Sequence, residues 1–186
     1  MLTWIILGVV VLAVLYGVAV YNRLVRLRAL VREAFSGITV QLRRRADLVP
    51  NLVSTVQGYA SHERETLDAV TAQRTAANNA GTVAATAQAD AGMTAMLGRL
   101  FAVAEAYPDL KADANFRELQ TELSGLETEL QSARRYYNAT ARDLNTRVVS
   151  FPDMFFAGPM GFREEPYYED ADASIQTAPK VDFKPA

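Results

Sequence analysis

The sequence contains no cysteine and only one histidine, His62. The lack of cysteine excludes disulfide frameworks, thiol nucleophiles, thiolate zinc sites and a lipoprotein-type acylated cysteine. A single histidine excludes zinc sites built on two histidines, and also the di-metal helical bundles that need a Glu-x-x-His motif on two helices. We therefore interpret His62 as a solvent-facing residue of a helix and predict neither a metal ion nor another cofactor.

Charged residues are absent from residues 2–21, which are almost entirely apolar. At ~1.5 Å per residue such a helix reaches roughly 30 Å, the thickness of the hydrocarbon layer of a bilayer. A cleaved signal peptide has basic residues before a shorter apolar core, and a core helix of a soluble domain has polar interruptions. Because neither feature occurs here, the sequence favours a transmembrane anchor over residues 1–21, with Trp4 and Tyr21 at the two interfaces.

Basic residues are absent before the apolar stretch, whereas seven arginines and a single acidic residue, Glu33, occur in residues 21–45. The positive-inside rule then favours an N-terminus outside the cell and the rest of the chain in the cytoplasm. Arginines beside anionic headgroups would add to the attraction for the lipid bilayer. The alternative, that these arginines only form a solvated helix face, stays open.

Beyond the anchor, apolar residues recur at steps of three and four, and no long run alternates with period two. This pattern predicts an all-α protein. The first apolar face continues from the anchor without a breaker, through Leu24, Leu27, Val31, Ala34, Ile38 and Leu42. Pro50 ends or kinks that helix, with Asp47 as a candidate N-cap. Whether one bent helix or two helices result is left open; the face continues through Val49, Val53, Val56, Ala60, Leu67 and Val70.

Three further segments complete the expected organisation. Residues 78–90 are rich in small residues and are interpreted as a flexible connection or a weakly formed helix. A third helix is expected from near Gly92, with Met93, Leu97, Leu100, Phe101 and Ala104 on one side, up to Pro108. A fourth begins at a capping box of Asn115 and Glu118 and ends at Phe151–Pro152. Its 3.5-residue apolar period from Phe116 to Leu144 predicts coiled-coil-like packing.

The predicted domains are therefore an anchor over residues 1–21 and a helical bundle over residues 22–150. An aromatic and proline-containing segment, residues 151–168, is expected to dock on the bundle. Residues 169–186 have the composition of a disordered acidic tail.

Polar residues within the predicted helices are the candidates for a site. Glu105 is either a general acid or base or the partner of Arg45 or Arg134 in an ion pair across helices. The pairing is favoured because no nucleophile or second carboxylate lies at a telling spacing. The run Arg43 to Arg45 is a candidate nucleic-acid patch, but the acidic pI of about 5.5 and the lack of interleaved aromatics favour lipid proximity or salt bridges.

Asp47, Asn51, Asn138 and Asn145 are mediocre helix formers placed in predicted helices. Two interpretations stay open for them: a buried hydrogen-bond network that fixes the register of the helices, or a surface for self-association.

Several separated motifs resemble the LemA family, in the family's order. They are QLRRRADLVPNLV at residues 41–53, EAYPDLKA at 105–112 with Asn115–Phe116, ARRYYN at 133–138, Asn145, and Phe151–Pro152. The resemblance covers roughly residues 1–168. It implies a bacterial plasma-membrane protein with an N-terminal transmembrane helix, an antiparallel bundle of long helices and no established enzymatic activity. The structural or interaction candidates are Arg44, Arg45, Asp47, Pro50, Asn51, Glu105, Tyr107, Pro108, Asn115, Phe116, Arg134, Tyr137, Asn138, Asn145, Phe151 and Pro152.

The sequence and the resemblance together predict a membrane-anchored, non-enzymatic helical scaffold that self-associates or organises membrane-protein assemblies. The alternative is an accessory or regulatory subunit of a membrane peptidase or signalling complex. The expected partners are the lipid bilayer, further copies of the chain and a membrane protein, and no nucleic acid.

Overall fold

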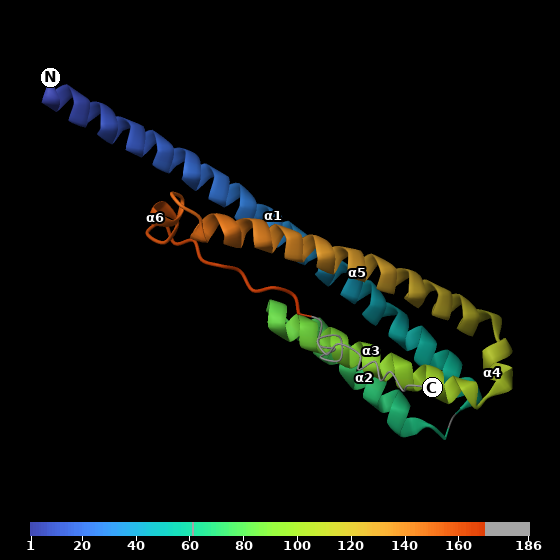
Figure 1. The fold of residues 1–186 in the computed structure, drawn as a ribbon. Helices are drawn as coiled ribbons and strands as arrows, with labels where there is room; N and C mark the ends of the chain where they lie inside the picture. Colours follow the sequence, from blue (N-terminus) through green and yellow to red (C-terminus); the bar gives the residue numbers. More distant parts are fainter. Residues whose placement is uncertain (61, 170–186) are drawn as a thin grey trace, which may run out of the picture. The chain divides into compact units, whose positions relative to one another are not determined.

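The structure, a computed structural model, describes residues 1–60 and 62–169. Almost all of the predicted acidic tail, residues 170–186, lies outside this range. Within it every regular element is an α-helix, which confirms the predicted all-α fold of a long apolar N-terminal helix followed by packed helices (Figure 1). The helices are α1 (Leu2–Tyr59), α2 (Arg64–Asn79), α3 (Val83–Glu105), α4 (Pro108–Ala112), α5 (Ala114–Val149) and α6 (Met154–Ala157).

The chain forms two compact units. The first contains Met1–Leu48 and Arg117–Tyr168, and the second contains Val49–Phe116. The first unit therefore joins the beginning of the chain to the segment that follows the second unit.

In the first unit α1 packs antiparallel to α5. The rings of Phe35 and Tyr137 lie 5.9 Å apart, and ten residues further along α1 Arg45 reaches back to Glu127, ten residues earlier on α5. The apolar faces predicted for both helices are confirmed as core at most of their three- and four-residue steps, and only Leu27, Leu119 and Ala133 are half-buried. The buried residues of the two faces in this unit are Leu24, Val31, Ala34, Ile38, Leu42, Leu123, Leu126, Leu130, Tyr137, Thr140 and Leu144. Coiled-coil geometry for this pair stays a prediction.

Pro50 does not end a helix, since it lies inside α1. A proline in a helix interior costs roughly 3 kcal/mol, but each fully buried Val or Leu contributes about 1.5–3 kcal/mol. Val49, Leu52 and Val56, which flank Pro50, are all buried and offset that cost. Asp47 is consequently an exposed residue within α1 rather than an N-cap. The helix ends only at Tyr59, and His62 lies exposed in the turn before α2.

The second unit contains a hairpin of α2 and α3, and here the predicted start of the third helix was wrong. Of the two interpretations left open for residues 78–90, the structure shows helix rather than a flexible connection. Residues 78–90 are mostly helical, because α2 extends to Asn79 and α3 begins at Val83 rather than near Gly92. The reason is a cap that the sequence reading missed: the Thr82 hydroxyl accepts a hydrogen bond of 3.2 Å from the Ala85 amide. Alanine, which dominates this stretch, is the best helix former.

The cap of α5 also differs from the prediction. The Phe116 amide donates to the Asp113 carboxylate over 2.9 Å, so Asp113 caps the helix, whereas Asn115 is an exposed residue inside it. Pro108 opens the short helix α4 at its first position, where a missing N–H costs nothing. The ring of Phe116 is buried edge-on against Phe101, at 6.1 Å between centroids.

Candidate functional site

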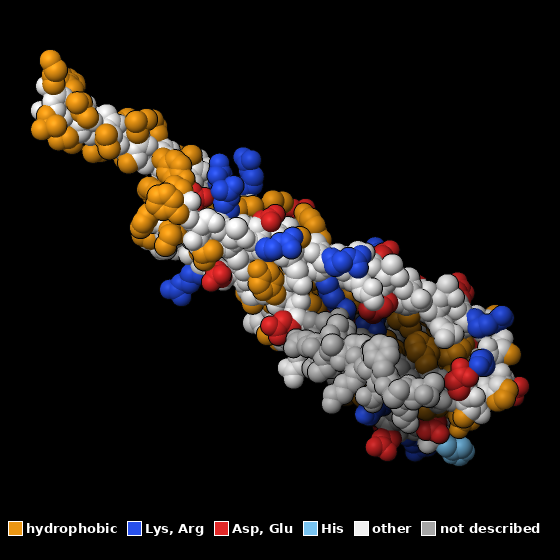
Figure 2. All heavy atoms as spheres, viewed as in Figure 1, with side chains coloured by type: hydrophobic (Ala, Val, Ile, Leu, Met, Phe, Trp, Pro, Cys, Tyr) orange, Lys and Arg blue, Asp and Glu red, His pale blue; other side chains and the backbone are white. Residues whose placement is uncertain are grey.

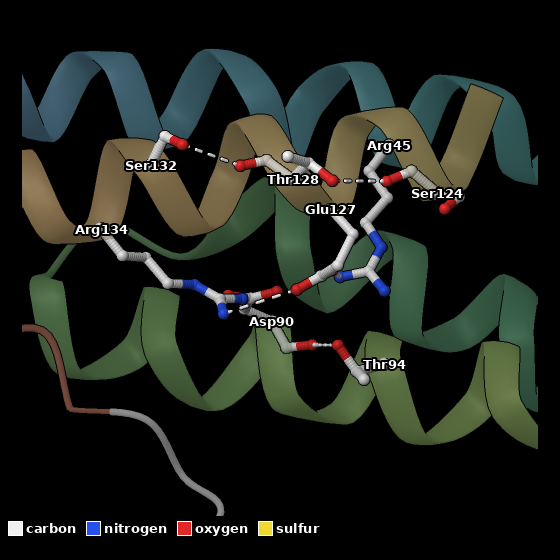
Figure 3. A network of polar contacts seen from close by, with 8 residues as sticks. All are labelled: Arg45, Asp90, Thr94, Ser124, Glu127, Thr128, Ser132 and Arg134. Carbon is white, nitrogen blue, oxygen red and sulfur yellow. Dashed lines mark hydrogen bonds and ion pairs between the residues drawn. The ribbon is translucent and has the colours of Figure 1, made fainter. Parts of the chain in front are cut away.

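An ion-pair cluster lies between α1 and α5 in the first unit. The Glu127 carboxylate is placed between the guanidinium groups of Arg45 and Arg134, at 3.2 Å and 3.7 Å (Figure 3). The side chain of Arg45 is only 8% exposed and that of Arg134 14%, so both charges are largely withdrawn from water. Such a cluster is a costly way to gain stability, but it fixes which residues of two helices face each other.

For Glu105, which lies in the second unit, pairing with Arg45 or Arg134 of the first unit stays a prediction. Glu105 is exposed and forms an ion pair with Lys111, at the end of α3 and in α4. The carboxylate that the two arginines share is Glu127, on the same helix as Arg134, where only the three-dimensional register places it opposite Arg45. Arg44, the neighbour of Arg45, points to solvent and meets Glu129 at 3.9 Å with both side chains more than half exposed.

Two asparagines of α5 hold an extended segment, residues 162–168, which we call the strap. The Asn145 side chain donates to the Glu165 carbonyl and accepts from the Glu165 amide, both over 2.8 Å. Asn138 does the same with Tyr168, over 3.0 Å and 2.8 Å. Each amide side chain thus pairs with both backbone groups of one residue, as the backbone of a neighbouring β-strand would.

The spacing of Asn138 and Asn145 along α5 explains how both side chains can pair with the backbone of the strap. Asn138 and Asn145 lie seven residues apart, two helical turns, which is ~10.5 Å along α5. Glu165 and Tyr168 lie three residues apart, which is ~10 Å in an extended chain. The two repeats match, so the strap runs along α5 in the opposite direction. Of the two interpretations left open for these asparagines, the structure places them in hydrogen bonds within the chain.

Tyr137 completes the fixation of the strap. Its ring is fully buried, and its hydroxyl donates to the Pro166 carbonyl over 2.7 Å. Burial first, and the nearby charge of Glu165 second, raise the pKa of the Tyr137 phenol to about 12. Tyr168, at the end of the strap, is also buried and has the Arg134 guanidinium 5.6 Å from its ring centroid. The ion-pair cluster and the strap are therefore joined through Arg134.

The other predicted residues do not form one site. Asp47 and Asn51 are exposed one turn apart on α1. Tyr107, half-buried, and Pro108 lie at the α3–α4 junction in the second unit. Phe151 is 78% exposed, and the Phe151–Pro152 peptide bond is cis.

The second unit also contains a hydrogen bond that the sequence reading missed. The Tyr59 hydroxyl donates to the Asp113 carboxylate over 3.1 Å, and this bond raises the pKa of the tyrosine. Asp113 therefore bonds the end of α1 while it caps α5. Tyr59 and Asp113 lie 54 residues apart in the sequence, so no local sequence pattern predicts their hydrogen bond.

No group of three or more metal-binding side chains occurs in the described parts of the chain. Among the same residues, one helix is long and apolar enough to cross a membrane, namely α1, whose most apolar window has a mean hydropathy of 2.5 with 11% of its residues buried. A core helix of that composition would be covered by neighbours. Its exposure indicates a membrane-associated protein.

Comparison with known proteins identifies the family. The profile described as LemA family matches residues 34–183, which is most of the chain. This chain belongs to the LemA family. The match begins inside α1 and includes the ion-pair cluster and the strap. It also runs past Tyr168, where the resemblance seen in the sequence motifs ends.

Individual relatives of this LemA-family chain are distant. It is 25% identical to magnetosome protein MamQ 2 of Paramagnetospirillum magneticum over 179 residues, covering 82% of this chain and 66% of the relative. It is 28% identical to protein LemA of Metamycoplasma hominis over 131 residues, covering 70% of this chain and 60% of that one. The chain spans less than two thirds of the length of each of these relatives.

Proposed function

We propose that this LemA-family chain is a membrane-anchored scaffold whose bundle self-associates beside the membrane. The anchor is the apolar part of α1, residues 2–21. No catalytic role is assigned to any residue. The bundle serves as a binding platform for other copies of the chain and for membrane-protein partners.

The observation that carries the proposal is the continuity of α1. The same helix contains the exposed apolar stretch and the buried face from Leu24 to Leu42 that packs on α5. A flexible linker would let a tethered domain move freely relative to the anchor. An unbroken helix instead fixes both the distance of the bundle from the membrane and its orientation about the helix axis. The outer faces of α1 and α5 are then presented at a fixed position above the bilayer, as assembly of several copies requires.

The names of the relatives also support a membrane-anchored scaffold. Three of the matched proteins are named as magnetosome proteins, and a membrane-anchored bundle is compatible with that name. The arginines directly after the apolar stretch favour a cytoplasmic bundle with the N-terminus outside. A reporter fused after Tyr168 tests that orientation, since cytoplasmic and exported reporters are active in opposite compartments.

Asp47 and Asn51 are the candidates for the self-association face. They lie one turn apart, exposed, and are the members of the predicted polar set that the structure leaves on the surface. Short polar side chains on an accessible helix face can form hydrogen bonds between copies at small entropic cost.

Cross-linking of the full-length chain in membranes, followed by size analysis in detergent, tests the proposal. We expect one defined homo-oligomer, weakened by Asp47→Arg or Asn51→Arg and kept by Gln57→Arg, an exposed position on a different face of the same helix. A monomer at all protein concentrations would contradict self-association. A stoichiometric membrane protein that co-purifies with monomeric chain would instead favour the accessory-subunit alternative.

A further inference from the structure

The loop around α6, residues 151–161, exposes large apolar side chains. The exposed fractions are 78% for Phe151, 48% for Met154, 64% for Phe155 and 37% for Met160. No charged residue occurs from Met154 to Phe162. The surfaces of soluble monomeric proteins rarely expose so many bulky apolar side chains in so short a segment. Such patches mark an interaction with another apolar surface.

This loop lies against the apolar stretch of α1. The Phe156 ring packs over Gly17, where an added Cβ would approach the ring to 3.2 Å, and lies 5.7 Å from the ring of Tyr16. Phe156 and Met160 also line an open groove whose floor is formed by Val10, Ala13 and Val14 of α1. In Figure 2 the hydrophobic side chains over α6 lie directly beside those that cover the N-terminal part of α1.

The position along α1 defines a depth. Arg23 is the first charged side chain after the apolar stretch, and Gly17 precedes it by six residues. Six residues of helix correspond to ~9 Å. Elements that lie in a membrane interface bury their apolar faces by about 5–10 Å, so the contact of Phe156 with Gly17 falls at that depth.

Polar contacts hold the start of the loop at this depth. The Tyr16 hydroxyl donates to one oxygen of the Asp153 carboxylate over 2.6 Å, and Arg147 lies 3.7 Å from the other. The Asp153 side chain is only 3% exposed, so its charge is covered and paired rather than open to hydrocarbon.

The end of the loop is held as well. Arg28 donates to the Gly161 carbonyl over 2.8 Å and lies 4.1 Å from the centre of the Phe162 ring, which also meets Tyr21 edge-on. Gly161 has a φ of +76°, a conformation that glycine adopts without strain, and this turns the chain back toward the strap. The apolar tip between Asp153 and Gly161 is therefore fixed beside α1.

We propose that residues 151–161 insert into the same bilayer leaflet that surrounds the C-terminal end of the anchor, with acyl chains filling the groove beside Val10 and Ala13. The inference rests on the proposed anchoring of residues 2–21. Lipid is the occupant because the floor of the groove is the anchor itself, so whatever reaches it does so from within the membrane. The bundle then has two attachments to the bilayer, which fix its rotation about α1.

The experiment uses tryptophan fluorescence in vesicles, since Trp4 is the single tryptophan of the chain. Full-length protein carrying Trp4→Phe and Phe155→Trp is reconstituted in phosphatidylcholine–phosphatidylglycerol vesicles with or without acyl-brominated lipid. We expect blue-shifted emission, quenching by brominated lipid comparable with that of native Trp4, and protection from iodide. The matched control, Trp4→Phe with Tyr136→Trp on the exposed side of α5, is expected to be quenched by iodide and not by brominated lipid.

The native protein separates failure of this inference from failure of the anchor. If Trp4 is quenched by brominated lipid while Trp at position 155 is quenched by iodide, the loop is solvated and the inference is wrong although the anchor stands. If position 155 is shielded from both quenchers, a protein surface covers the loop and lipid insertion is overturned. If Trp4 itself escapes brominated lipid, the anchor proposal falls first.

Discussion

At the scale of single residues, the described structure depends on a few polar groups withdrawn from water. Glu127 forms ion pairs with two guanidinium groups, Asn138 and Asn145 pair with the backbone of the strap, and Asp153 joins Tyr16 to Arg147. The contacts of Glu127 with Arg45, of the two asparagines with the strap and of Asp153 with Tyr16 join residues at least 20 positions apart in the sequence. The ones on α5 stabilise a particular register of α1 and the strap, which apolar packing alone would leave less well defined.

Replacement of Glu127 by Gln removes the charge that Arg45 and Arg134 share. We expect the free energy of unfolding to fall by ~1–3 kcal/mol, below the full cost for a buried pair because Glu127 is about one third exposed. Glu129→Gln, on the same helix but in an exposed pair with Arg44, is expected to change it by less than ~0.5 kcal/mol. Urea unfolding of the full-length chain in detergent, followed by circular dichroism, compares the two. Equal effects would contradict the assigned role of the cluster.

The raised pKa of Tyr137 makes stability depend on alkaline pH. Below pH 10 the phenol is protonated in both folded and unfolded chains, and its contribution is fully present. Between pH 10 and the folded pKa of about 12, the unfolded chain ionises first, so the free energy of unfolding falls by up to ~3 kcal/mol.

The Tyr137→Phe variant separates this effect from that of other tyrosines. It loses the hydrogen bond to Pro166, which lowers stability by ~1 kcal/mol near neutral pH, but it also lacks the ionisable group. We expect its stability to decline less steeply than that of the native chain from pH 10 to 12, in the same unfolding assay. Parallel declines would show that the Tyr137 hydroxyl is not buried as described.

At the scale of elements, the strap is the segment whose position depends most on individual hydrogen bonds. Asn138→Ala and Asn145→Ala each leave one backbone N–H and one C=O of the strap without a partner, at a cost of ~1–3 kcal/mol. We expect faster hydrogen exchange at the Glu165 and Tyr168 amides, largest at the residue that lost its partner. Asn115→Ala, an exposed position in α5, serves as the control. Unchanged exchange in both variants would contradict the pairing.

At the same scale, the buried faces of the helices were predictable from the sequence and their ends were not. The apolar faces of α1 and α5 followed from three- and four-residue steps, because burial of these side chains dominates helix packing. The helix ends were less accessible. Thr82 and Asp113 cap helices through single local hydrogen bonds, and the predicted caps Asp47 and Asn115 have equally suitable side chains. Whether Pro50 ends the helix or lies within it could not be decided from the sequence, because the burial of its neighbours that offsets its cost depends on tertiary packing.

The candidate site was less predictable still. Arg45, Arg134, Asn138 and Asn145 were singled out from the family-like motifs, but their partners were not. Glu127 is one of several glutamates along α5, and the strap residues contribute backbone groups, which leave no trace in side-chain identity. Pairing between distant segments follows from register, and register is a property of the assembled core.

At the scale of the whole molecule, we propose that α1 is both the membrane anchor and a member of the bundle. The change from one role to the other falls between Tyr21, which ends the apolar stretch, and Leu24, the first fully buried leucine. In this proposal the arginines that follow orient the chain, and the α6 loop is its second attachment to the bilayer.

Single-cysteine scanning along α1 tests this claim most directly, because the chain has no native cysteine to interfere. Each of residues 2–42 is replaced in turn in the full-length chain, spin-labelled and reconstituted in vesicles, and its accessibility to oxygen and to a water-soluble nickel complex is measured. We predict high oxygen accessibility at most positions from 5 to 18, followed by a 3.6-residue alternation between buried and water-accessible sites from 24 to 42. Access of the nickel complex to most of positions 5–18, or loss of the alternation directly after them, would contradict the account.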